Sequence, residues 1–147
     1  RIQGRASCKK GAVGAFKSSR KQFEAYIASE ALANVQIVAG WFHVTLPPRG
    51  LQHVAFLRLD GDLYNSTIVA LQRLYPLVSY RGVVYVDDYG SFSGCSRAVD
   101  EYLGSIGLNH VHLNKVREKT GRFEAVWFLK PYGRMPRGAN ATAALLR

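Results

Sequence analysis

This 147-residue chain has little cysteine, methionine, proline or acidic residue. Its two cysteines, Cys8 and Cys95, are too few for a disulfide framework and lack the paired spacing of a zinc site. No apolar run reaches the ~18 residues that a membrane helix needs, and the opening segment lacks the apolar core of a secretory signal. We therefore expect no membrane partner, and two free thiols favour a reducing, cytoplasmic location.

Acidic residues are scarce: 10 carboxylates face 20 lysines and arginines, for a net charge of +10. Such a balance raises the question of nucleic acid, but the basic residues crowd the two ends and no nucleic-acid-binding signature is present. We expect no specific nucleic-acid partner. The composition predicts an irregular basic segment over 1–17, a folded part over 18–131 and a basic, flexible tail over 132–147.

The folded part alternates strand-like and helix-like stretches. Runs of β-branched or nearly continuous apolar residues predict strands over 35–40, 53–60 and 82–88. Apolar residues at helical spacing predict helices over about 19–32, 66–77 and 95–106. Two further runs, 110–116 and 123–131, flank the Thr120-Gly121 turn signal. The order predicts a doubly wound α/β sheet that ends in an antiparallel hairpin.

Four of the ten carboxylates fall into two pairs, Asp60 with Asp62 and Asp87 with Asp88, each after a predicted strand. Ligands of open α/β sheets bind outside the carboxyl ends of the strands, so neighbouring strands would bring these acids together. Carboxylates packed this closely repel unless a cation lies between them, and oxygen ligands suit Mg²⁺. Any one of them alone could be a helix cap or an Asx turn; two pairs joined by a helix favour a metal site.

The motifs RLDGDLY, LYP and VDDYG stand in that order, with GWF-TLP (40–47) ahead of them and a GC-AVDEY helix after them. In this arrangement the chain strongly resembles the macrocin O-methyltransferase family over about residues 18–131. Members of this family methylate hydroxyls on sugars of macrolides and related natural products, with S-adenosylmethionine as co-substrate. The resemblance implies the later strands of a Rossmann-like class I methyltransferase sheet, with the N-terminal part of that domain missing.

The resemblance also implies roles for individual residues. Asp60, Asp87 and Asp88 would ligate Mg²⁺, and Asp62 would be the general base; which of Asp60 and Asp62 is the ligand stays open. The turn formed by Gly40, Trp41 and Phe42 would line the adenine side of S-adenosylmethionine, and Asp60 would also lie at the cofactor. The other partner would be a small-molecule hydroxyl acceptor.

The chain departs from the family pattern in three places. Asn65 stands where members usually carry an acidic residue after DGDLY, and Ser79-Tyr80-Arg81 replaces part of a paired-glycine loop before Gly82. No glycine-rich turn follows a first strand, because no buried strand precedes Gly11 and Gly14. We therefore expect an incomplete cofactor site, and an unpaired sheet edge that favours a homo-oligomer. The start at Arg1 is either a cut or a processed end.

Two other functions compete with methyl transfer. Asp60-Gly61-Asp62 also fits the Asp-x-Asp metal motif of nucleotide-sugar glycosyltransferases, but that interpretation leaves Asp87-Asp88 and GWF-TLP without a role. An inactive fragment or a basic interaction domain would account for the net charge of +10 and for the absent glycine-rich turn. The sequence favours a metal-dependent O-methyltransferase over both.

Overall fold

The computed structural model describes residues 19–132. Along the chain it contains α1 (Arg20–Ser29), α2 (Phe42–Thr45), β1 (Val54–Leu59), α3 (Tyr64–Leu74), the 3₁₀ helix η1 (Tyr75–Leu77), β2 (Val78–Val86), α4 (Ser93–Ser105), β3 (Asn114–Arg117) and β4 (Phe123–Leu129). The expected basic segment 1–17 and, apart from Tyr132, the expected tail lie outside the described residues.

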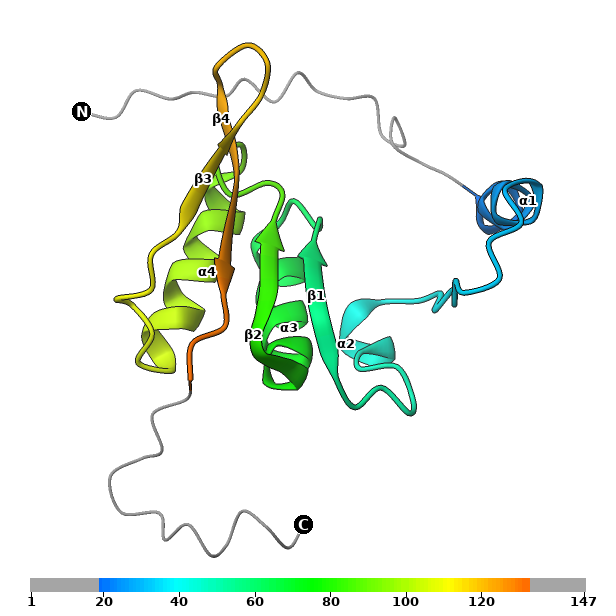
Figure 1. The fold of residues 1–147 in the computed structure, drawn as a ribbon, viewed down its shortest axis with the longest axis horizontal. Helices are drawn as coiled ribbons and strands as arrows, with labels where there is room; N and C mark the ends of the chain where they lie inside the picture. Colours follow the sequence, from blue (N-terminus) through cyan, green and yellow to red (C-terminus); the bar gives the residue numbers. More distant parts are fainter. Residues whose placement is uncertain (1–18, 133–147) are drawn as a thin grey trace, which may run out of the picture.

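The four strands form one sheet in the order β1-β2-β4-β3 (Figure 1). β1 and β2 run parallel and are joined by α3, whereas β4 runs antiparallel to both β2 and β3. The α/β sheet with a terminal antiparallel hairpin is thus confirmed. Because the parallel pair is in register from Phe56 opposite Val83 to Leu59 opposite Val86, both strands end at the same edge of the sheet.

The core lies between the sheet and the helices α3 and α4, which stand behind it in Figure 1. Alternate residues of each strand turn toward these helices, so Leu57 and Leu59 of β1 are buried whereas Phe56 and Arg58 are exposed. Val84, Val86 and Phe128 complete this buried face from β2 and β4. Each such side chain stabilises the fold by about 1.5–3 kcal/mol. The carboxyl ends of β1 and β2 are therefore held by a packed layer.

Residues 35–40, expected as a strand, are irregular in the structure, where they belong to the connection from α1 to α2 that runs away from the sheet (Figure 1). A β-branched run becomes a strand only when a neighbour satisfies its backbone groups. No segment within 19–132 pairs with this run. The preceding α1 begins at a Ser19–Gln22 capping box and buries none of its residues. Among the described residues, α1 therefore buries no residue and residues 35–40 pair with no strand.

The other boundaries differ by a few residues. α3 begins at Tyr64 rather than at Ser66 or Thr67, because the Thr67 hydroxyl donates to the Leu63 carbonyl from inside the first turn instead of capping it. β2 begins at Val78, since a bulge with Arg81 at φ +60° absorbs the stretch expected as a loop. None of the helices in the described part of the chain has the length and apolarity to cross a bilayer.

Candidate functional site

The candidate site lies at the edge where β1 and β2 end together. Asp60 directly follows Leu59, the last residue of β1, and Asp88 comes two residues after Val86, the last of β2. The Asp87 amide donates to the Leu59 carbonyl at 2.9 Å and continues the pairing one step beyond the strands. The connection from β1 to α3 carries Asp62. Two segments 26 residues apart in the chain thereby place their acids side by side.

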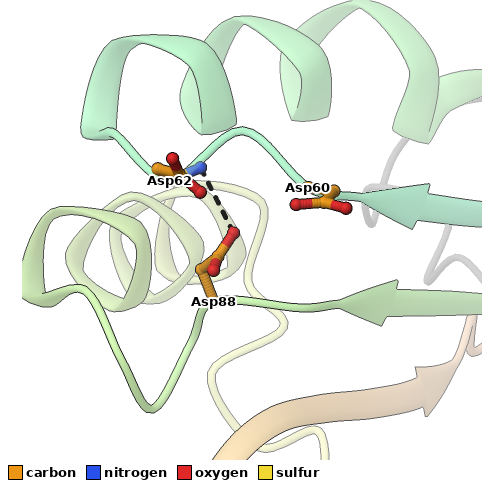
Figure 2. A group of neighbouring side chains, drawn as sticks. All are labelled: Asp60, Asp62 and Asp88. Carbon is orange, nitrogen blue, oxygen red and sulfur yellow. Dashed lines mark hydrogen bonds between the residues drawn. The ribbon is translucent and has the colours of Figure 1, made fainter. Parts of the chain in front are cut away.

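Asp60, Asp62 and Asp88 form one group, in which each residue offers a carboxylate oxygen within 4.8 Å of the others. Figure 2 shows Asp62 and Asp88 facing each other, with Asp60 beside them just past the end of β1. Asp62 adopts a left-handed conformation, φ +55°, and its backbone N–H donates to Asp88 Oδ2 at 3.3 Å. This rare conformation for a residue other than glycine directs the amide at Asp88 and leaves the Asp62 carboxylate exposed.

Asp88 is the electrostatically strained member of the group. It is only 9% exposed, whereas Asp60 and Asp62 face solvent. Burial, followed by the adjacent Asp62 carboxyl, raises the pKa of Asp88 to about 6. A buried carboxylate beside two others is stabilised by a proton or by a cation. Three oxygen donors at this spacing match the preference of hard divalent ions such as Mg²⁺.

Asp87, the fourth predicted acid, is directed elsewhere. Its Oδ2 accepts a hydrogen bond from Arg58 Nη2 at 2.8 Å, and the same guanidinium nitrogen lies 2.9 Å from Asp60 Oδ2. Asp60 therefore belongs both to the group of three acids and to the ion pair with Arg58. Sequence reasoning missed Arg58, although a lone cation in the apolar β1 run, two residues before Asp60, was a visible signal.

The predicted cofactor turn leads into α2. Gly40 has φ +142°, and a Cβ there would meet Thr45 Cγ2 at 2.6 Å, so the position requires glycine. Trp41 is 77% exposed. Phe42 lines a cavity of about 190 Å³ with Asp60 and Gly61, and its ring approaches the position of a Gly61 Cβ to 3.6 Å. The structure thus brings Phe42 and Asp60 to one cavity.

The chain matches the macrocin O-methyltransferase (TylF) family over residues 13–124. The match covers both acidic pairs at the carboxyl ends of β1 and β2, and it covers the turn at Gly40. The chain belongs to this family, which confirms the resemblance drawn from the motifs.

Individual relatives agree. The chain is 52% identical over 68 residues to demethyldecarbamoylnovobiocin O-methyltransferase of Streptomyces niveus, a match that spans 46% of this chain and 26% of that protein. It is 44% identical over 75 residues to the 8-demethyl-8-(2,3-dimethoxy-alpha-L-rhamnosyl)-tetracenomycin-C 4'-O-methyltransferase of Streptomyces olivaceus, covering 51% of this chain and 28% of that protein. The solved structure of the O-methyltransferase NovP superposes with a TM-score of 0.70 at 32% identity, over 89% of this chain and 54% of NovP.

Proposed function

We propose that the chain carries the ion- and acceptor-binding part of an S-adenosylmethionine-dependent O-methyltransferase that acts on a hydroxyl of a sugar or other natural product. The observation that carries the proposal is the convergence of Asp60, Asp62 and Asp88 at one sheet edge in a member of this family. The relatives named above are O-methyltransferases, and the name of one includes a rhamnosyl group, which supports a glycosylated natural product as acceptor. The chain spans little more than a quarter of these curated relatives.

The acids are proposed to hold Mg²⁺. Asp60 and Asp88 are proposed as ligands, because both lie in the group of three and both match the family motif; Asp62 is the alternative to Asp60. Asp87 is proposed as the third ligand, which requires its carboxylate to leave Arg58. When bound, the ion would lower the pKa of the acceptor hydroxyl and fix its position. The donor set suits this ion because it offers hard oxygen ligands alone.

Asp62 is proposed as the general base. Its carboxylate is exposed and lies beside Asp60 and Asp88, so an acceptor hydroxyl held at the group comes within reach of it. Because the backbone of Asp62 is left-handed, its amide N–H donates a hydrogen bond to the Asp88 carboxylate. The Asp62 carboxylate stays available to take the proton. Asp62 is therefore proposed to position Asp88 with its backbone amide and to accept the proton with its carboxylate.

Gly40, Trp41, Phe42 and Asp60 are proposed to line the cofactor. S-adenosylmethionine would supply a methyl group already activated by its sulfonium centre. The cavity beside Phe42 adjoins Asp60, so the cofactor and the acids would share one wall. Residues 18–131 are proposed as the methyltransferase part of the chain. The family match favours methyl transfer over glycosyl transfer from a nucleotide sugar, because VDDYG and GWF-TLP have a role only in the former.

A graft tests the proposal with a defined acceptor. The matched segment of this chain would replace its 68-residue counterpart in the novobiocin relative, to which it is 52% identical, and methyl transfer from labelled S-adenosylmethionine would be followed with and without EDTA. We expect EDTA-sensitive transfer that Mg²⁺ restores. A folded graft that binds S-adenosylmethionine but transfers no methyl group would mean that this segment is inactive. Full activity in EDTA would remove Mg²⁺ from the proposal.

A further inference from the structure

Arg58 occupies an unusual position in β1. The strand places it between the buried Leu57 and Leu59, so its side chain projects from the face that α3 and α4 leave uncovered. From there it reaches beyond the end of the strand and contacts Asp60 and Asp87 at 2.9 and 2.8 Å. One guanidinium nitrogen thus joins the first acidic pair to the second.

These contacts mean that the Arg58 guanidinium and a bound divalent cation would compete for the same carboxylates. Asp60 Oδ2 pairs with Arg58, while Asp60 is also one of the three acids that converge on one point. Asp87 is the only one of the four acids outside that group, and its Oδ2 is held by Arg58. A bound ion would draw on the same negative charge that Arg58 already neutralises.

The ion pair is also weak enough to be displaced. The Arg58 side chain is 52% exposed, and the Asp60 and Asp87 side chains are 49% and 29% exposed. Pairs this open to water are screened and contribute little to stability. A divalent cation, with twice the charge and a demand for carboxylate oxygens, can therefore compete with the guanidinium for both acids.

We propose that Arg58 is a positioning residue that acts as an internal competitor of the divalent ion: it holds Asp87 and Asp60 in the ion-free protein and releases Asp87 when the ion binds. The inference rests on the proposed divalent site. Arg58 thereby sets the affinity and the ligand set of that site, and it keeps the two acidic pairs from repelling one another when the ion is absent.

A double-mutant cycle tests the competition. Mn²⁺, which can be followed by electron paramagnetic resonance, would be titrated into the full 147-residue chain and into Arg58→Met, Asp87→Asn and the double variant. We expect Arg58→Met to bind Mn²⁺ about tenfold more tightly than the wild type, a change equivalent to ~1.4 kcal/mol. The loss on Asp87→Asn should be several-fold larger in the Arg58→Met background, because only there is Asp87 free of its competitor.

Two control variants separate charge from geometry. Arg73→Met removes a cation from the last turn of α3, at the far end of the helix from the acids, and should leave the Mn²⁺ affinity unchanged. Arg58→Lys keeps the charge but cannot bridge two carboxylates in the same way, so its affinity should lie between those of the wild type and Arg58→Met.

The possible results are distinct. Mn²⁺ binding by the wild type with equal or weaker binding by Arg58→Met would overturn the inference and leave the divalent site standing. Equal losses on Asp87→Asn in both backgrounds would do the same, since they show no coupling. Absence of Mn²⁺ binding in both the wild type and Arg58→Met, with both proteins folded by circular dichroism, would overturn the divalent site and the inference together.

Discussion

Replacing Asp88 by asparagine should stabilise the protein in the absence of metal. The carboxylate is buried against Asp62, and its pKa is raised from 3.8 to about 6. Two pKa units correspond to ~3 kcal/mol between the charged and neutral forms. Water around the exposed Asp60 and Asp62 screens part of the electrostatic cost of the charged Asp88. We therefore expect the free energy of unfolding to rise by ~1–2 kcal/mol in Asp88→Asn. An asparagine oxygen can still accept the hydrogen bond from the Asp62 amide.

The sign of the pH dependence follows from the direction of the shift. A carboxyl whose pKa is raised by folding binds more protons in the folded state, so its favourable contribution is present at low pH and is lost as pH rises from ~4 through ~6. The advantage of Asp88→Asn should therefore be complete at pH ~7.5 and should vanish near pH ~4. Thermal melting in EDTA across this range measures it, with an expected rise in Tm of ~3–8 °C at the upper end.

Added Mg²⁺ should reverse the order of the two proteins. An ion that binds only the folded state stabilises it by mass action, so the wild type should gain several degrees in ~10 mM Mg²⁺ while Asp88→Asn gains little. Glu30→Gln, which removes an exposed carboxylate at the end of α1, should respond to Mg²⁺ as the wild type does. Asp88→Asn that is less stable than the wild type in EDTA at every pH would refute the electrostatic argument.

Three further outcomes are expected. Asp62→Asn in the novobiocin-enzyme graft should lose ~10²–10⁴-fold in methyl-transfer rate at any Mg²⁺ concentration, whereas rescue by Mg²⁺ would make Asp62 a ligand instead of the base. The isolated 147-residue chain should bind S-adenosylmethionine weakly in calorimetry, because Gly40 to Phe42 form only part of a pocket; low-micromolar affinity would contradict this. Gly90→Ala should lower Tm by an amount equivalent to ~2 kcal/mol, since a Cβ would lie 2.5 Å from the Phe123 carbonyl oxygen, while Gly104→Ala, with open space around it, should be neutral or stabilising.

Local sequence patterns were enough to predict the elements that pack against one another. The apolar runs ending at Asp60 and Asp88 form neighbouring parallel strands, and the Thr120-Gly121 signal lies between two antiparallel strands. These predictions succeed because an apolar run of strand length, bounded by turn residues, is typical of a strand that packs in a sheet. The run 35–40 is also rich in β-branched residues, but it forms no strand. A strand requires a neighbouring strand to pair with, and no segment within 19–132 pairs with this run.

The candidate site was likewise predictable from the sequence only in part. The sequence by itself determined that two acidic pairs follow two buried strands and that they would meet at one edge of an α/β sheet. Only the tertiary structure decided which acids face one another: the turn of Asp62 into the left-handed region aims its amide at Asp88, and Arg58, reaching from the uncovered face, draws Asp87 away. Burial likewise distinguishes Asp88 from Asp60, although both follow equivalent strands. Side-chain direction and burial depend on what lies across the sheet, and this information is not contained in the spacing of residues along the chain.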